Sequence, residues 1–243
     1  MADVRPPWRI PLLILGFASL IIGVGAGLLR LGWAVPRPAA DLAAFHGPLM
    51  VSGFFGTVIS LERAVALAQR WVYLGPLAAG VGGLALILGA PPAAAQALLA
   101  LGSAVLLAGS VSVFLRQRAL FTFTLAAGAA SWLMGNLLWL GGFSVYEVVP
   151  WWAGFLVLTI AGERLELSRF LPPSPVAQRV FIGVLAGLTF GMAFQPQVFG
   201  AALLVLALWL LRQDIARRTV KDTGLTRFIA VCLLSGYGWL ALY

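Results

Sequence analysis

The sequence predicts an all-α integral membrane protein of about nine transmembrane helices, with its N-terminus inside and its C-terminus outside. Hydrophobic residues make up 61% of the chain and charged residues 10%, too few charges to cover a soluble domain. Apolar runs long enough to cross a bilayer core of about 30 Å recur along the chain. Since backbone groups in lipid need internal partners and the runs lack the alternation of barrel strands, each run is expected to be helical.

Turn-forming residues divide these runs into elements. Gly and Pro mark the joints, at Pro36 and Pro38, Pro91 and Pro92, Gly141 and Gly142, Pro172 to Pro175, and Pro196. The predicted helices are residues 10–32, 44–66, 72–90, 96–115, 119–141, 147–167, 178–194, 197–212 and 226–243. The first helix follows Arg5 and Arg9 as a signal peptide would, but it is too long for one and is predicted to remain uncleaved. We expect one transmembrane domain over residues 1–243.

The basic residues set the expected orientation. The chain carries 16 Lys and Arg residues and a net charge of +8. With the N-terminus inside, all of them except Arg30 and Arg37 fall on the cytoplasmic side, which is the positive-inside bias of multi-pass proteins. We interpret the positive charge as a result of the membrane topology and as a source of attraction to membrane lipids. No nucleic-acid partner is expected. The expected location is a bacterial-type plasma (inner) membrane.

The chain contains an internal repeat. Gly53-Phe54, Ile59 and Glu62-Arg63 recur in the same order and at constant spacing as Gly154-Phe155, Ile160 and Glu163-Arg164. The repeats cover residues of about 8–117 and 118–213, and an extra helix follows at about 226–243. A unit of four helices is even-numbered, so both copies are expected to share one orientation, related by a pseudo-two-fold axis along the membrane normal.

Polar residues at the outer start of the second helix of each repeat are candidates for a site. The only histidine, His46, precedes Met50 by one helical turn, and Glu147 occupies the equivalent position in the second copy. An imidazole within a membrane can bind haem iron or copper. The alternative interpretation is a histidine at the membrane interface that is hydrogen-bonded to a loop carbonyl, with nearby Tyr and Trp as an aromatic belt.

The stretch from His46 to Phe54 resembles the histidine, methionine, glycine and phenylalanine spacing of NnrS-type membrane proteins. It is also similar to the haem-ligand helix of haem–copper oxidase subunit I. The NnrS-type family consists of multi-helix haem and copper proteins linked to nitric oxide metabolism. The resemblance implies haem b with His46 as axial ligand and a small gas ligand such as nitric oxide. This chain has Pro48 and Leu49 where the family carries a second histidine and a glutamate, so no copper site is expected.

The repeated Glu-Arg pairs lie at the predicted cytoplasmic ends of their helices. Neighbouring residues on a helix point about 100° apart, so members of one pair cannot bind each other well. The repeat suggests Glu62 with Arg164 and Glu163 with Arg63, because buried charges need partners. We interpret these pairs as a structural clasp or, alternatively, as a gate on a proton or anion path.

Two functions agree with these features. One is a haem-binding membrane protein that handles nitric oxide or electrons near the outer face. The other is a permease, or a scaffold subunit with partner subunits, whose polar path runs between the repeats. No Walker, Rossmann, serine-hydrolase or zinc-protease pattern is present, so no enzymatic reaction is assigned.

Overall fold

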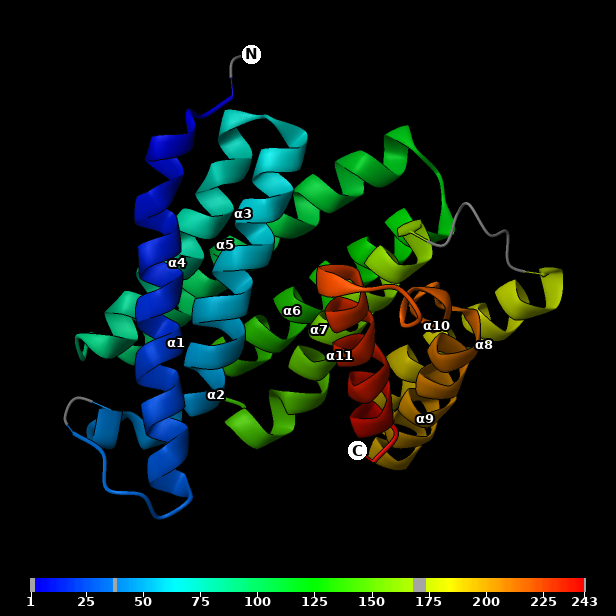
Figure 1. Cartoon of the computed structure of the whole chain (residues 1–243). Coiled ribbons are helices and arrows are strands. Elements are labelled where there is room, and N and C mark those ends of the chain that lie inside the picture. Colours follow the sequence, from blue (N-terminus) through cyan, green and yellow to red (C-terminus); the bar gives the residue numbers. More distant parts are fainter. Residues whose placement is uncertain (1–2, 37–38, 168–173, 243) are drawn as a thin grey trace. The chain divides into compact units, whose positions relative to one another are not determined.

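A computed structural model of the chain describes residues 3–36, 39–167 and 174–242. Within these ranges every regular element is a helix (Figure 1). Eight of the described helices are long and apolar enough to cross a membrane: Pro6–Arg30, Asp41–Leu67, Arg70–Ile87, Pro92–Arg116, Leu120–Leu140, Val145–Leu167, Pro175–Phe194 and Pro196–Gln213. The predicted all-α class is confirmed, and the arrangement is consistent with a multi-pass membrane protein.

The ninth predicted span is a shorter helix. Helix α11 runs over Gly224–Leu240 and has 17 residues, which is the lower end of the length that crosses a bilayer. The other predicted spans agree with the eight long helices to within a few residues at most ends. Arg37 and Arg169, which entered the comparison of basic residues on the two sides, lie outside the described residues.

The chain divides into two compact units. Unit 1 comprises Met1–Arg118 and Ala126–Phe155, and unit 2 comprises Ala119–Leu125 and Leu156–Tyr243. The units do not coincide with the two predicted repeats, because residues 126–155 of the second repeat belong to unit 1. Helices α6 (Leu120–Leu140) and α7 (Val145–Leu167) each contribute residues to both units. The symmetry between the repeats stays a prediction.

Unit 1 contains the first half of the chain. Its further elements are η1 (Pro6–Arg9), α1 (Ile10–Arg30), η2 (Ala39–Phe45), α2 (His46–Pro48), the π-helix η3 (Leu49–Phe55), α3 (Gly56–Leu67), η4 (Arg70–Tyr73), α4 (Leu74–Ile87) and α5 (Pro92–Arg116). Small residues let these helices approach closely: a Cβ at Gly83 of α4 would lie 3.1 Å from the Cα of Gly53 in η3. Such contacts are usual for helices in lipid. The hydrophobic effect does not drive helices together there, so close packing of small residues and hydrogen bonds between polar residues stabilise their association.

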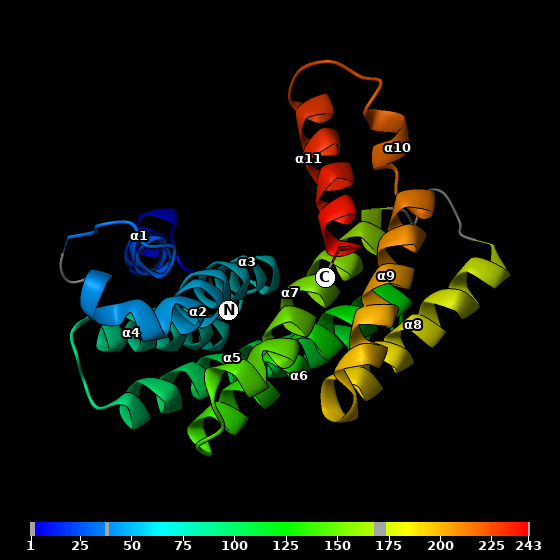
Figure 2. The same cartoon turned by 90° about the horizontal axis from the view of Figure 1, so that it is seen from below.

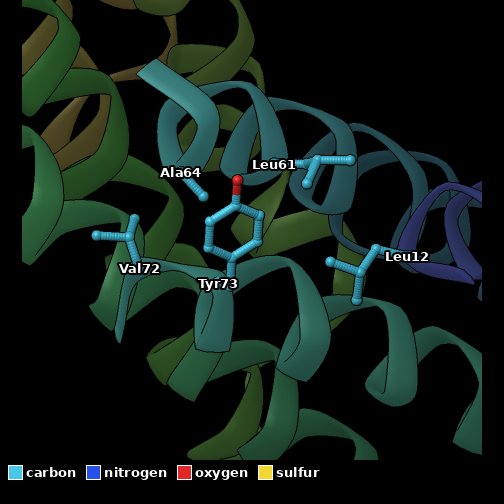
Figure 3. Close-up of a cluster of buried hydrophobic side chains, with 5 residues drawn as sticks. All are labelled: Leu12, Leu61, Ala64, Val72 and Tyr73. Carbon is cyan, nitrogen blue, oxygen red and sulfur yellow. The ribbon is translucent and has the colours of Figure 1, made fainter. Parts of the chain in front are cut away.

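A small apolar cluster in unit 1 secures the N-terminal segment. Figure 3 shows the Tyr73 ring pointing toward Leu61 and Ala64 of α3, with Leu12 of α1 nearby. The Tyr73 hydroxyl donates to Oδ1 of Asp3 at 2.8 Å, and Arg9 Nη2 donates to Oδ2 at 2.5 Å. The hydrogen bond from Tyr73, assisted by Arg9, holds the pKa of Asp3 below its ordinary value. The ring and the carboxylate together hold the N-terminal segment against the helices.

Unit 2 is built on a helical hairpin. Helix α8 (Pro175–Phe194) starts at the N-cap Ser174, whose hydroxyl accepts from the Ala177 N–H at 3.2 Å. The hairpin continues into α9 (Pro196–Gln213), and the short α10 (Ala216–Thr219) leads to α11, which packs beside α9 and α10 (Figure 2). Much of α11 is exposed, since Ala230 and Tyr237 are its only buried residues among those described.

Candidate functional site

His46 lies at the start of the second long helix and contacts α1. Its Nδ1 lies 2.7 Å from the carbonyl oxygen of Gly23. A carbonyl oxygen can only accept, so Nδ1 is the donor in this contact; in the neutral form of the ring, Nε2 then carries the lone pair. The bond is to a helical carbonyl rather than the loop carbonyl that one of the two sequence interpretations expected. This hydrogen bond also fixes the orientation of the ring, as the partners of ligating histidines commonly do.

The face of α1 beneath His46 is made of glycine. A Cβ at Gly27 would lie 2.7 Å from both Cε1 and Nδ1 of His46, so only glycine leaves room for the ring there. A Cβ at Gly23 would lie 3.0 Å from Sδ of Met50. Two glycines one helical turn apart therefore carry His46 and Met50 side by side against α1.

A π-helix follows His46 directly. The sequence predicts a regular helix over residues 44–66, whereas the structure has α2, then η3 over Leu49–Phe55, then α3. The wider turn of a π-helix inserts an extra residue and rotates the residues after it, and such segments often occur at functional sites. Here Met50 contacts α1 while Ser52, two residues later, turns toward α6. Sequence periodicity does not show this change because the apolar run continues through it.

The buried side of the π-helix meets a polar network centred on Asn136 of α6. Its Oδ1 accepts from the Ser52 hydroxyl at 3.0 Å and from Trp152 Nε1 at 3.1 Å. Its Nδ2 donates to the Leu99 carbonyl and to the Ser103 hydroxyl, both at 3.2 Å. The Asn136 side chain thus joins η3, α5, α6 and α7, and all four of its hydrogen-bonding positions are used.

Aromatic rings surround this network. Trp132 Nε1 donates to the Ser52 hydroxyl at 2.9 Å, and the Trp132 ring stacks on Phe155 with centroids 4.9 Å apart. Trp139 meets Trp152 edge to face at 5.7 Å. Sequence reasoning missed this cluster. The available signal was Asn136 itself, the single asparagine of the chain, placed within an apolar run beside tryptophans.

Glu147 has a capping role in the structure. Its Oε2 accepts from the Ser144 N–H and hydroxyl, each at 2.7 Å, while the Glu147 N–H donates to the Ser144 hydroxyl at 3.4 Å. This reciprocal pair is a capping box at the start of α7, and the pattern Ser-x-x-Glu before an apolar run was its sequence signal. Arg30 donates to the Tyr146 hydroxyl at 3.1 Å, beside a cavity of about 350 Å³ also lined by Ala43 and Ala44.

The charged residues of the two repeats lie in different surroundings. Glu62 is exposed on α3, and Arg63 is half-buried. The Arg63 side chain packs near α5, since a Cβ at Gly109 would lie 3.8 Å from Arg63 Cγ. Glu163 is half-buried on α7. The pairing of Glu163 with Arg63 stays a prediction.

Arg164 binds Asp214 in unit 2, a partner that sequence reasoning missed. Arg164 Nε donates to Oδ2 and Nη2 to Oδ1, both at 2.7 Å, in the bidentate geometry of a strong pair. The pairing of Glu62 with Arg164 stays a prediction. Asp214 follows α9 directly, where its oxygens also accept from the Ala216 N–H and the Tyr237 hydroxyl. The signal was a lone carboxylate at a helix end in a chain with only 8 acidic residues.

Electrostatics stabilise the ionised form of Asp214. Its side chain is fully buried, and burial alone would raise its pKa. Hydrogen bonds from Arg164 and Tyr237 outweigh this effect and hold the pKa below the ordinary value of 3.8. Arg164 keeps 13% of its side chain exposed, so the pair lies at the margin of the helical hairpin.

The donor set limits the metals that could bind. Over the described residues no group of three or more His, Cys, Asp or Glu side chains is close enough to hold a metal ion. A site with several protein ligands, as copper requires, does not fit these residues. A group held by one imidazole fits the donor chemistry of His46.

Over its described residues the chain is all-helical, with eight helices long and apolar enough to cross a membrane, a glycine-supported histidine and a buried polar network at Asn136. The chain belongs to the family described as domain of unknown function DUF8744, whose model matches residues 9–243. No curated protein and no solved structure matches the chain.

Proposed function

We propose that this protein is a haem-binding membrane protein in which His46 is the single axial ligand of a b-type haem. The observation that carries the proposal is the hydrogen bond from His46 Nδ1 to the Gly23 carbonyl at 2.7 Å. It supports a tautomer in which Nε2 is free to bind iron, with a partner that orients the ring. The short resemblance of residues 46–54 to NnrS-type proteins supports the same function.

The neighbouring residues have specific roles in this proposal. Met50 lies beside His46 against the same glycine face of α1, which supports packing next to the group rather than ligation from its opposite side. Arg30 lines the cavity formed with Ala43 and Ala44, which are close in the sequence to His46, and would offer a cation to a carboxylate of the bound group. Glu147 acts indirectly, by fixing the start of α7 beside this cavity.

A haem with one protein ligand keeps a position for a small gas such as nitric oxide, or can exchange electrons. The chain would contribute an imidazole whose orientation is fixed by the Gly23 carbonyl. The Gly23 carbonyl, as acceptor of the Nδ1 proton, would make the imidazole a stronger donor toward iron. The residues described here supply no second histidine, so the proposal requires no copper.

Purified protein from haem-supplemented cells tests the proposal by its visible absorption spectrum. We expect about one b-type haem per chain and a Soret band that shifts when nitric oxide or carbon monoxide is added. His46→Ala should abolish haem retention while circular dichroism keeps the helical spectrum. Met50→Leu is the matched control, because it keeps apolar packing one turn away and should retain haem. Colourless wild-type protein would exclude the proposal.

The membrane and the orientation are part of the proposal. We infer a multi-pass protein of a bacterial-type plasma (inner) membrane with the N-terminus in the cytoplasm. The uneven distribution of arginine between the two sides supports this orientation.

A scaffold subunit of a membrane complex is the second candidate. The observation in its favour is Arg164, expected as part of a clasp or alternatively of a gate, which is held by two hydrogen bonds to Asp214. A side chain fixed in this way suits a structural support better than the mobile charge of a permease. If the purified protein binds no haem, this scaffold function becomes the leading candidate. Co-purification of partner subunits with the chain is its test.

A further inference from the structure

An apolar groove runs along α11 within unit 2. It has a volume of about 440 Å³ and is lined by Val157 and Ile160 of α7, by Leu210 of α9, and by one face of α11 from Phe228 to Leu240. With a rise of 1.5 Å per residue, this face is about 18 Å long. One leaflet of a bilayer has a hydrocarbon depth of about 15 Å, half of the 30 Å core. The groove is therefore as long as one leaflet is deep.

The lining favours a hydrocarbon ligand. Tyr237 carries the only hydroxyl among the described residues of the lining, and that hydroxyl donates to Asp214. The Asp214 carboxylate is bound by Arg164 at the same time. The groove consequently offers no free hydrogen-bonding group apart from the weakly polar thiol of Cys232, and a polar ligand would lose its hydration without replacement.

Basic side chains gather at the Phe228 end of the groove. Arg217 and Arg218 lie on α10, Lys221 lies in the turn that follows, and Arg227 is adjacent to Phe228; all four are exposed. Asp222 is the one carboxylate between residues 215 and 231. Clusters of Lys and Arg beside a membrane-spanning segment attract anionic lipid head groups.

We propose that this groove binds an acyl chain of an anionic phospholipid, with the phosphate at the basic cluster of Arg217, Arg218, Lys221 and Arg227. The apolar groove matches the acyl chain in length and polarity, and the cations at its end match the negative charge of the phosphate. A second copy of the chain fits less well. A two-fold axis along the membrane normal would bring the two basic clusters together, and like charges would repel.

Native mass spectrometry of the detergent-purified protein tests the site with phosphatidylglycerol and phosphatidylcholine of identical acyl chains. Wild-type protein should bind phosphatidylglycerol about tenfold more tightly, because the cluster adds contacts to an anionic head group. Equal affinity for the two lipids would overturn the assignment of the phosphate position.

Two glycines of α11 offer a matched pair of variants for the groove. Gly236 lines the groove and Gly238 does not, and a Cβ at either position would meet no atom within 4 Å. They point about 200° apart on the helix. Gly236→Phe should weaken phosphatidylglycerol binding at least about tenfold, whereas Gly238→Phe should leave it unchanged. Equal effects of the two variants, or a dimer lost in Gly236→Phe alone, would contradict the proposal.

Charge variants test the head-group contact without altering the groove. Because Arg218 and Arg227 are exposed, the double variant Arg218→Gln with Arg227→Gln should fold normally and lose the preference for phosphatidylglycerol. Arg179→Gln, an exposed arginine of α8, is the control and should keep the preference. A preference that survives the double variant would show that the cluster does not hold the phosphate.

Discussion

Asn136 shows how a single polar side chain can organise a set of apolar helices. It is fully buried and uses both donor and both acceptor positions of its amide, across three other helical elements. A satisfied network of this kind specifies the register of the helices, while each partner left unpaired after its removal would carry a desolvation cost. The residue therefore acts on stability and on specificity together.

Asn136→Leu should destabilise the protein by about 2 kcal/mol, because it leaves the buried Trp152 indole N–H without its acceptor and removes the other bonds of the network. The measurement is the free energy of unfolding in mixed micelles. Ser131→Ala, on the same helix, removes a buried hydroxyl that bonds only its own helix at Ala127, and should cost well under 1 kcal/mol. Equal losses would show that the network adds nothing to ordinary packing.

Asp214→Asn should destabilise the protein by roughly 3 kcal/mol, because it leaves the Arg164 guanidinium without its counter-charge. Asp222→Asn, an exposed carboxylate in the following turn, is the control and should have little effect. Unfolding of both variants under the same conditions gives the comparison.

The same carboxylate predicts a dependence on pH. Its folded pKa lies below its ordinary value of 3.8, so its contribution to stability is complete above that value. The contribution is lost as the pH falls through the lower, folded pKa. Wild-type protein should therefore lose stability on acidification more steeply than Asp214→Asn does. Parallel curves for the two proteins would show that Asp214 does not titrate with folding.

At the scale of the element, α1 contacts the second predicted span closely at Gly23 and Gly27 but not at Gly16. A Cβ at Gly27 would overlap the His46 ring, whereas a Cβ at Gly16 would meet Thr57 at an ordinary 3.4 Å. The difference arises because an aromatic ring is stacked on the helix backbone at Gly27 and a branched side chain lies slightly farther away at Gly16. The positions of small residues along one helix thus determine which side chains can approach it.

Gly27→Ala should displace His46 and cost about 1–3 kcal/mol, the range for overpacking at a tight contact. Gly16→Ala is the matched substitution on the same helix and should be neutral or nearly so. Thermal unfolding of the apoprotein measures the effect on packing. If the haem proposal holds, Gly27→Ala should also lower the haem content, while Gly16→Ala should not. If Gly27→Ala is as stable as the wild type, α1 and His46 can move apart at this contact without a measurable cost.

At the scale of the whole molecule, topology depends on the arginines between the spans. Reporter fusions within residues 90–95 and 142–147 should report the outside, and fusions at residues 116–118 should report the inside. A fusion in the predicted loop at residues 168–178 should also report the inside. An outside signal from that loop would reverse the proposed orientation of the second half of the chain.

The sequence by itself determined the helical class and the approximate position of each long helix. These properties follow from composition and from the length of apolar runs, which are local along the chain. It also pointed to His46 as the residue to examine. The π-helix was missed because an apolar run reads alike in α and π geometry.

Only the tertiary structure decided which residues meet. Asn136 bonds Ser52 at a separation of 84 residues, and Arg164 bonds Asp214 at a separation of 50. The repeat did not point to Asp214 as a partner of Arg164, since similarity between copies carries no information on a residue that one copy lacks. In lipid, the outer surface of a helix is as apolar as its packed surface, so hydropathy does not reveal which face turns inward. Partner choice is therefore set by how the helices pack against one another.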